Sequence, residues 1–210
     1  MPEVTREPRP ASLHLASRNA KKIAEMERML AAHLPGVRVL GLDDVEHYPE
    51  PVEDEATFAG NALLKARAGA AATGLATVAD DSGLCVDALN GMPGVLSARW
   101  SGPPKDDARN NRLLLDQLAD VPDERRGAHF VCAVAVVLPD GREHVVEGRM
   151  DGTVIREVRG EGGFGYDGLF VADARPGLST AELSVSEKDA ISHRGAALRE
   201  LAVPLRDLLV

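Results

Sequence analysis

The stretch AHFVCAVAVVLPDGREHVVEGRM, residues 128–150, decides the fold of this chain. Its first part, Ala128 to Leu138, is an apolar run rich in valine, and a run of this length is typical of a buried strand. Pro139-Asp140-Gly141 has the composition of a tight turn, and Glu143 to Met150 follows as a partner strand. The stretch therefore predicts an antiparallel hairpin with one deeply buried strand.

Helices and strands alternate on both sides of this hairpin. The last helix begins with a capping-box pattern at Ser186 and Asp189 and runs through about Leu201, after which Pro204 bends or breaks it. Interleaved helices and strands with one hairpin predict an α/β fold, a mixed sheet flanked by helices. The other expected elements are strands at 13–15, 37–42, 75–79 and 169–171, and helices from 20 to a stop at Pro35-Gly36, from the N-cap Thr57 to 72 before Gly74, and from 106 to 118.

The composition limits the classes of function. Apolar residues make up 44% and charged residues 27% of the 210 residues, which excludes a disordered or collagen-like chain. Aromatic residues make up only 3%, so Ala, Val and Leu must build most of the core. The net charge of −9 opposes non-specific binding to nucleic acid or to an anionic membrane. An anionic ligand therefore needs a local basic pocket or a metal ion.

The cysteines and the N-terminus indicate a cytoplasmic protein. Cys85 and Cys132 each lie in an apolar run, so we expect two buried free thiols and no disulfide framework. Residues 1–11 are polar and rich in proline and arginine, so we expect a flexible tail without the apolar segment of a signal peptide. The longest apolar run, Val131 to Leu138, is too short to span a bilayer.

The segment Ser17-Arg18-Asn19-Ala20-Lys21-Lys22 lies between the first strand and the first helix. Backbone N–H groups at a helix N-terminus favour an anion, and a hydroxyl, an amide and a lysine would complete a phosphate site. The alternative is that Ser17 or Asn19 only caps the helix while the lysines are solvated. From this segment alone both interpretations stay open.

Acidic residues follow the strand at 75–79. Asp80-Asp81-Ser82-Gly83 is placed where ligands gather in α/β sheets, beyond the carboxyl end of a strand, and two carboxylates there suit Mg²⁺. The alternative is an acidic turn with Gly83 at positive φ. In a second acidic cluster, at 50–55, one member is a further candidate metal ligand. On the helix after Thr57, Asn61 and Lys65 share one face and either point into a site or form an exposed polar stripe.

Two segments near the C-terminus carry further candidates. Gly160 to Gly168 holds five glycines in nine residues, which lets the backbone approach a ligand, and Phe164 and Tyr166 offer flat faces for a base. A plain flexible loop is the alternative. Lys188, Ser192, His193 and Arg194 then fall in the first two turns of the last helix, where the destabilising Gly195 suggests that something approaches the helix closely.

Taken together, these segments resemble the inosine triphosphate/xanthosine triphosphate pyrophosphatase family, from about residue 13 to 201. Five segments occur in the family's order: 15–22, 57–67, 78–84, 162–167 and 190–195. The resemblance implies an elongated α/β fold with a long central mixed sheet, two lobes and a nucleotide-binding cleft between them, so that residues 12–210 form a single pyrophosphatase domain. It also implies a homodimer and Mg²⁺-dependent hydrolysis of non-standard purine triphosphates (ITP, dITP and XTP) to monophosphate and pyrophosphate, which keeps these nucleotides out of DNA and RNA.

The resemblance also implies the roles of individual residues. Asp81 matches the catalytic residue that binds metal and activates water, and Glu53 matches a second metal ligand. The segment that matches the phosphate contacts consists of Ser17, Arg18, Asn19, Ala20, Lys21 and Lys22, and Ser82 matches a substrate contact beside Asp81. The residues that match contacts around base and sugar are Phe164, Gly165, Tyr166, Asp167, Lys188, His193 and Arg194. We expect Lys65 to contact phosphate oxygens alongside Lys22, while the role of Asp80 is left open between a second carboxylate near the metal and a structural residue.

The chain departs from the family pattern at two positions. Arg18 stands where the family usually has glycine, and it either strains the turn or reaches the phosphates. Gly168 stands where the family usually has proline, and it is expected to loosen the base pocket. Two rival functions are a pyrophosphatase acting on pyrimidine or modified standard nucleotides and a nucleotide-binding regulator without turnover. The presence of both Asp81 and Glu53 favours an enzyme.

Overall fold

The computed structural model describes residues 12–33 and 36–209. The expected tail at 1–11 and the expected helix stop at Pro35 lie outside the described residues. Within them, no helix is long and apolar enough to cross a membrane. Cys85 and Cys132 are both buried and free, as the sequence predicts.

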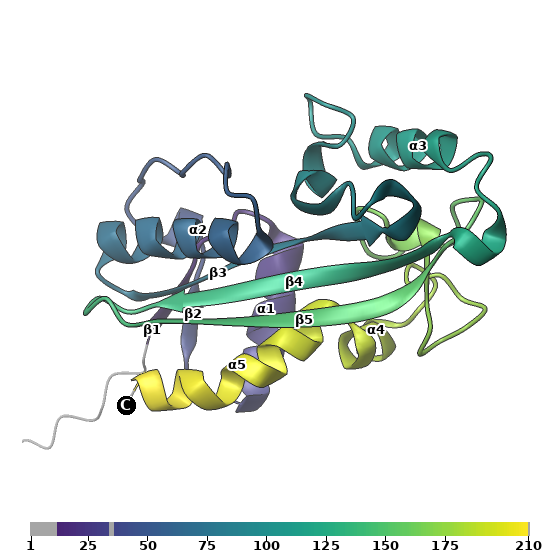
Figure 1. The fold of residues 1–210 in the computed structure, drawn as a ribbon. Helices are drawn as coiled ribbons and strands as arrows, with labels where there is room; N and C mark the ends of the chain where they lie inside the picture. The colour runs from purple at the N-terminus through teal and green to yellow at the C-terminus, as the bar shows by residue number, and fades with distance from the viewer. Residues whose placement is uncertain (1–11, 34–35, 210) are drawn as a thin grey trace, which may run out of the picture.

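A single six-stranded sheet runs the length of the molecule (Figure 1). Its strand order is β2-β1-β3-β4-β5-β6. The short β1 pairs in parallel with β2 and β3, and the remaining pairs are antiparallel. The strands are β1 (Ser12–Leu15), β2 (Arg38–Leu40), β3 (Ala76–Val86), β4 (Gly127–Val137), β5 (Glu143–Val154) and β6 (Phe170–Ala172). The expected elongated mixed sheet flanked by helices is therefore confirmed, whereas the division into two lobes stays a prediction.

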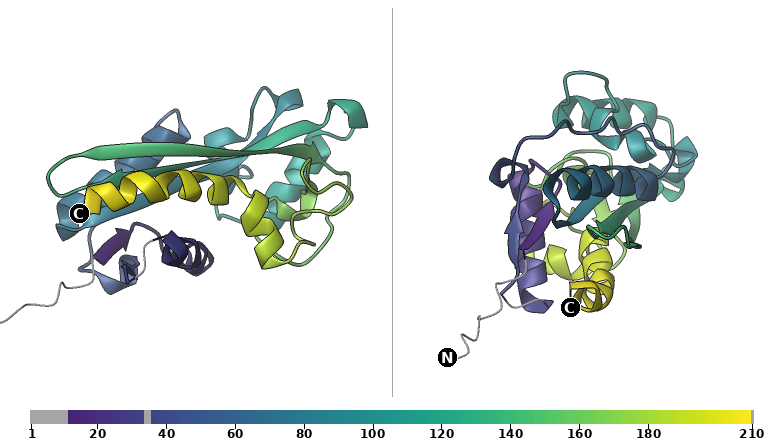
Figure 2. Two further views of the ribbon diagram at one scale, coloured as in Figure 1. Left: turned by 90° about the horizontal axis from the view of Figure 1, so that it is seen from below. Right: turned by 90° about the vertical axis from the view of Figure 1, so that its left-hand side faces the viewer.

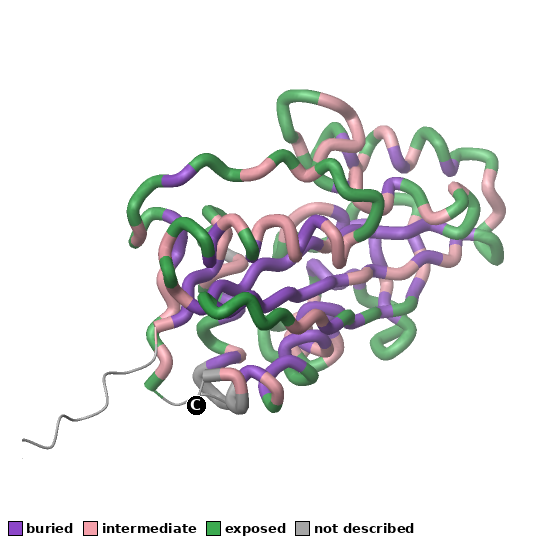
Figure 3. The backbone as a smooth tube through the Cα atoms, turned by 60° about the vertical axis from the view of Figure 1, so that its left-hand side comes forward, coloured by how far each residue is buried: buried purple, intermediate pink, exposed green. Residues whose placement is uncertain are grey.

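The hairpin expected from residues 128–150 is the centre of this sheet. In the turn, the N–H of Gly141 donates to the carbonyl of Leu138 at 2.9 Å. β4 is buried on both faces because helices cover both, which explains its unbroken apolar run. Figures 1 and 2 show α2 (Phe58–Thr73) along one face of the long strands and α5 (His193–Leu209) along the other. Figure 3 shows buried backbone along the middle of the sheet, while the neighbouring β5 alternates between buried and exposed residues.

The two faces of β4 differ in side-chain size. Cys132, Val134 and Val136 pack with Leu198 and Leu201 of α5. The opposite face consists largely of alanine, which lets α2 approach the sheet closely and accounts for a core with few aromatic residues. The alanines of this contact are Ala62, Ala66 and Ala70 of α2 against Ala79, Ala133 and Ala135 of the sheet.

The helix expected after Thr57 begins where the sequence places its cap. Thr57 accepts a hydrogen bond from the N–H of Gly60 at 3.0 Å and caps α2, which ends at Gly74 in the left-handed conformation. Asp106 caps α3 (Asp107–Gln117) in the same way. α1 runs from Ala20 to His33. Short 3-10 turns connect the elements at 42–44, 87–89, 94–99, 123–125 and 167–169.

Two expectations about the elements are wrong. Asp80-Asp81-Ser82-Gly83 is neither a turn nor the end of a strand, because β3 continues to Val86 and these residues pair with β4, Asp80 opposite Val134 and Asp81 opposite Ala133. Gly83 accordingly has no positive φ. Pairing with the long β4 overrides the turn preference of the four residues.

The last helix is also different from its prediction. It is divided into α4 (Val185–Ile191) and α5, which are separated by Ser192 in an extended conformation. The capping box consists of Ser184 and Glu187, two residues before the expected pair. α5 then continues through Pro204 to Leu209. A Cβ at Gly195 would overlap the carbonyl oxygen of Asp189, so the close approach expected at this glycine comes from α4.

Candidate active site

A cavity of about 530 Å³ opens beside β3. β1 pairs with β3 only as far as Val78, and the chain then turns away at Ala16 toward α1. Neighbouring side chains of a strand point to opposite faces, yet Asp80 and Asp81 both line the cavity because it adjoins the edge of β3 beyond its pairing with β1. The rule that ligands gather beyond the carboxyl ends of strands therefore applies to β1 and not to β3.

The segment between β1 and α1 lines one part of this cavity through Ser17, Arg18, Asn19 and Lys22. Ala20 is not part of the lining, and the side chain of Lys21 lies outside the described part of the chain. The amide oxygen of Asn19 accepts a hydrogen bond from the N–H of Lys22 at 3.3 Å, so Asn19 caps α1 as well. Arg18 donates to Glu50 at 2.8 Å in an exposed ion pair.

Asp80 is the centre of a buried group of charges. It lies 2.9 Å from the Nζ of Lys22 and 3.2 Å from Arg194, which in turn lies 2.7 Å from Glu25 and donates to the hydroxyl of Ser82 at 3.0 Å. Burial alone raises the pKa of Asp80, but the charges of Lys22 and Arg194 outweigh it and hold that pKa well below its usual range. Asp80 is therefore an anion that pairs with two cations, and Arg194 is shared between Asp80 and Glu25.

Asp81 has a different environment. Its carboxylate accepts a hydrogen bond from the Nδ2 of Asn61 at 3.0 Å and from the N–H of Ser82 at 3.0 Å, and no ion pair to Asp81 occurs among the described residues. The carbonyl oxygen of Asn61 is itself held by the N–H of Glu55 at 3.0 Å. Burial raises the pKa of Asp81 and outweighs the charge of Lys65 and the hydrogen bond from Asn61, which lower it.

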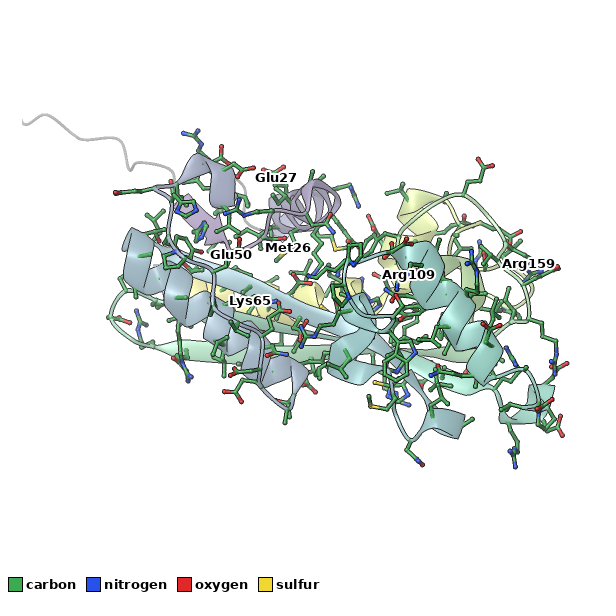
Figure 4. The ribbon with its side chains drawn as sticks, turned by 90° about the horizontal axis from the view of Figure 1, so that it is seen from above. Met26, Glu27, Glu50, Lys65, Arg109 and Arg159 are labelled. Atoms are coloured by element: carbon green, nitrogen blue, oxygen red, sulfur yellow. The ribbon has the colours of Figure 1, made fainter. Side chains whose placement is uncertain are left out.

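Glu53 lies on the segment that precedes α2. Its carboxylate is 2.6 Å from the Nζ of Lys65 and 3.6 Å from Arg99, which also donates to the backbone carbonyl of Glu53 at 2.9 Å. Burial raises the pKa of Glu53, but the charge of Lys65 outweighs it and the pKa is lowered. The polar face that Asn61 and Lys65 share on α2 therefore points into the site and is not an exposed stripe. Lys65 is labelled in Figure 4.

The glycine-rich loop is built around Asp167. The carboxylate of Asp167 accepts from the N–H of Phe164 at 2.8 Å and lies 2.5 Å from the Nζ of Lys188. Lys188 and Arg194 face the ring of Phe164, at 5.3 and 5.7 Å from its centre. Tyr166 is instead buried in the core with its hydroxyl donating to the carbonyl of Ser97 at 2.9 Å, so of the two aromatic residues Phe164 is the one left partly accessible.

Helix α3 is hydrogen-bonded to the same loop at Gly165. The carboxylate of Asp107 accepts from the N–H of Gly165 at 2.7 Å, and the Nδ2 of Asn111 donates to its carbonyl at 3.0 Å. Gly165 has a positive φ of 62°, which a residue with a Cβ rarely adopts. Two residues of one helix therefore fix the peptide next to Phe164.

His193 is buried at the start of α5. Its ring stacks on Phe130 with 4.9 Å between the ring centres, and its Nδ1 has no hydrogen-bond partner among the described residues. Burial and the neighbouring charge of Arg194 hold the pKa of His193 well below its usual value, so the imidazole is neutral.

The cavity thus brings together the candidate site residues whose side chains the structure describes, except Ala20 and Asn61, and Asn61 reaches it through its hydrogen bond to Asp81. Sequence reasoning missed several lining residues, among them Glu25, one helical turn from Lys22, and Lys105 and Asp107, which follow Pro103-Pro104. The spacing of Glu25, three residues after Lys22 on α1, could have predicted that both face the cavity. No pattern in the sequence indicates that the segment 101–107 lies beside the cavity. Glu50, Ser97, Ala98, Phe130 and Ser192 also line the cavity.

The charged side chains that line the cavity favour a bound metal ion when a polyanionic ligand is present. It contains seven carboxylates and six Lys or Arg side chains, so its formal charge does not by itself attract a triphosphate. Within the part of the chain that the structure describes, no group of three or more His, Cys, Asp or Glu side chains could hold a metal ion. The two neighbouring carboxylates Asp81 and Glu53 nevertheless suit Mg²⁺, which binds few protein oxygens and completes its shell with water and phosphate oxygens.

Comparison with known proteins shows the family of this chain. The model of the Ham1 family matches residues 13–203. A dITP/XTP pyrophosphatase of Nocardia farcinica is 62% identical over 199 residues, which cover 94% of this chain and 96% of that protein. Among solved structures, the nucleoside-triphosphatase / dITP/XTP pyrophosphatase of Mycobacterium abscessus is 58% identical with a TM-score of 0.75, covering 90% of this chain and 98% of that one. A HAM1 protein of Coxiella burnetii is 37% identical with a TM-score of 0.84, covering 94% and 99%.

Proposed function

Because this chain belongs to the Ham1 family, we propose that it hydrolyses dITP, ITP and XTP to the monophosphate and pyrophosphate and so removes non-standard purines from the nucleotide pool. The observation that carries the proposal is the single cavity that joins Asp81, Glu53 and the lysines to Phe164 and His193. A purine triphosphate needs these two kinds of surroundings, cations with a metal for the phosphates and a flat apolar face for the base.

Asp81 is the residue to which we assign the proton transfer. Its carboxylate is held by Asn61 and lacks an ion-pair partner among the described residues, so it is free to accept a proton from the attacking water. Water attacks the α-phosphorus, the bond from that phosphorus to the bridging oxygen breaks, and pyrophosphate leaves. When bound by Asp81 and Glu53, Mg²⁺ supplies charge neutralisation and polarisation of the phosphates.

Lys22 and Lys65 supply fixed positive charge to the phosphates. Each is paired with a carboxylate of the protein, Lys22 with Asp80 and Lys65 with Glu53, which fixes the position of its ammonium group before substrate binds. Ser17, Arg18, Asn19 and Ser82 complete the phosphate surroundings. Lys22→Ala should therefore weaken triphosphate binding far more than monophosphate binding.

Phe164 and His193 are the residues to which we assign the base. The ring of Phe164 stacks on the purine, with Lys188 and Arg194 beside it. The free Nδ1 of neutral His193 can donate to the C6 keto group of hypoxanthine or xanthine. Adenine has an amino donor at C6, which leaves a buried protein donor unpaired at a cost of about 1–3 kcal/mol. The Arg194 guanidinium is occupied by Glu25, Asp80 and Ser82, so its part is to complete the pocket wall and hold it in place.

The test is pyrophosphate release from a panel of ITP, dITP, XTP, ATP, GTP, dUTP and dTTP with Mg²⁺ or with EDTA. We expect kcat/KM for the first three to exceed that for ATP by about tenfold to a hundredfold, since one or two unpaired donors at 1.4 kcal/mol per decade give that range. Activity should vanish in EDTA and in Asp81→Asn. Equal rates on ATP would contradict the base assignment, and preference for dUTP or dTTP would favour a pyrimidine pyrophosphatase. From the family we also propose that the protein is cytoplasmic and forms a homodimer. Light scattering of the purified protein tests the oligomeric state.

A further inference from the structure

The cations of the cavity are not equivalent. Lys22, Lys65 and Lys188 each form an ion pair with a carboxylate, at 2.9, 2.6 and 2.5 Å. Lys105 also lines the cavity, but it forms no hydrogen bond or ion pair with any described residue. Lys105 is therefore a cation of the cavity that is not in direct contact with a carboxylate of the described residues.

The loop that carries Lys105 is held in place by the helix that follows it. Arg109 of α3 donates to the carbonyls of Ser101 and Pro103, at 3.0 and 3.4 Å. The amide oxygen of Asn110 accepts from the N–H of Ser101 at 2.8 Å. The backbone around Lys105 is thus fixed while its side chain stays exposed to the cavity, which is the arrangement of a residue that presents its charge to a ligand.

Lys105 reaches the cavity from a different element than the other phosphate residues. It precedes α3, whereas Lys22 lies on α1 and Lys65 on α2, and Figure 4 shows Lys65 and Arg109 well apart on the same side of the molecule. Lys105 lines the same cavity as Glu53 and Lys65.

We propose that Lys105 binds the pyrophosphate portion of the substrate and stabilises the charge that develops on this leaving group. The inference rests on the proposed function, because it assumes that a triphosphate occupies the cavity. Phosphoryl transfer depends on cations placed where negative charge increases, and a lysine without a protein partner loses no ion pair when it contacts phosphate.

The test compares Lys105→Ala with wild type for three ligands in the presence of Mg²⁺: XTP turnover, inorganic pyrophosphate as an inhibitor, and XMP binding by calorimetry. We expect KM for XTP and the inhibition constant of pyrophosphate to rise about tenfold, the effect of one lost charge-assisted hydrogen bond, while XMP binding stays within about twofold. Lys105→Arg should restore most of the affinity for pyrophosphate.

Arg112→Ala is the matched control. Arg112 is exposed on α3, lies outside the cavity lining and has the same charge, so its loss changes the net charge equally without touching the site. Pyrophosphate inhibition unchanged in Lys105→Ala, an equal loss of XMP binding, or an equal effect of Arg112→Ala would overturn the role of Lys105. If wild type releases no pyrophosphate from any triphosphate, the proposed function fails, whereas pyrophosphate binding measured directly on the two variants still decides the role of Lys105.

Discussion

Asn61 and Asp81 are hydrogen-bonded across the contact between α2 and β3, with the Nδ2 of Asn61 donating to the Asp81 carboxylate at 3.0 Å. Both side chains are buried, and the other end of the Asn61 amide is held by the N–H of Glu55. The helix thus fixes the orientation of the carboxylate to which we assign proton transfer, and Asn61 acts as a positioning residue.

Asn61→Ala should lower kcat for XTP by at least about tenfold while KM changes little, because the substrate contacts remain and only the orientation of Asp81 is lost. Steady-state kinetics with saturating Mg²⁺ measures both quantities. The variant should also lose about 1–3 kcal/mol of stability from the unpaired N–H of Glu55, so kinetics must be measured well below its Tm. Arg67→Ala, on an exposed position of the same helix, is the control, and an unaltered kcat in Asn61→Ala would contradict the positioning role.

Glu53→Gln should raise the Mg²⁺ concentration needed for half-maximal rate more than it lowers the maximal rate, because one of two metal carboxylates is lost. Arg99→Ala should shift the same quantity in the same direction by less, since Arg99 holds the Glu53 backbone at 2.9 Å without being a ligand. Mg²⁺ titration of XTP turnover measures both. A Mg²⁺ requirement unchanged in Glu53→Gln would remove Glu53 from the metal site.

Glu25→Ala should destabilise the protein by about 3–5 kcal/mol, because the buried guanidinium of Arg194 loses one of its two carboxylate partners. Replacing both residues, in Glu25→Ala with Arg194→Met, should recover part of this loss by removing the unpaired charge. Urea unfolding of wild type, the single variant and the double variant measures the effect. A double variant less stable than Glu25→Ala would show that the cost comes from lost packing and not from the buried charge.

Asn111→Ala should weaken XTP and XMP binding by the same factor, about threefold to tenfold, since the loop carrying Phe164 contacts the base that both ligands share. Asp107→Ala should act in the same direction through its bond to the N–H of Gly165. Calorimetry with XMP and the KM of XTP provide the comparison, and pyrophosphate inhibition should not change. An effect confined to triphosphates would place these residues with Lys105 at the phosphates.

The stability of the protein should fall as the pH is lowered from 7.5 to 5.5. Burial lowers the pKa of His14 and of His193, so below the unfolded value near 6.5 the unfolded chain binds more protons than the native state. The contribution of each histidine to the free energy of unfolding is complete above pH 6.5. Below pH 6.5 it is lost with a slope of up to about 1.4 kcal/mol per pH unit. Urea unfolding at the two pH values measures the slope.

His193→Gln should reduce this pH slope even though it lowers stability at pH 7.5. The same substitution at the exposed His47 is the matched control. A slope that is the same in wild type and in His193→Gln would show that His193 is not kept neutral by burial.

Local patterns in the sequence were sufficient for most of the elements. The apolar run, turn and partner strand at 128–150 predicted the β4–β5 hairpin, and Thr57 and Gly74 predicted the ends of α2. Asp80-Asp81-Ser82-Gly83 was assigned wrongly because its composition favours a turn, whereas its pairing with β4 is a contact between residues about fifty positions apart. Such a long-range pairing leaves no trace in the local pattern.

The sequence by itself determined the class of fold, the caps of α2 and the hairpin, because these depend on neighbours a few positions apart. Only the tertiary structure decided how the charges pair. It places Asp80 with Lys22 and Arg194, gives Asp81 hydrogen bonds from Asn61 and Ser82 but no ion pair among the described residues, and brings Lys105 to the cavity without a direct carboxylate contact there. The physical reason is that charge pairing and burial depend on distances between β3, α1, α2, α3 and α5, and these distances are set by packing of the whole sheet and its helices.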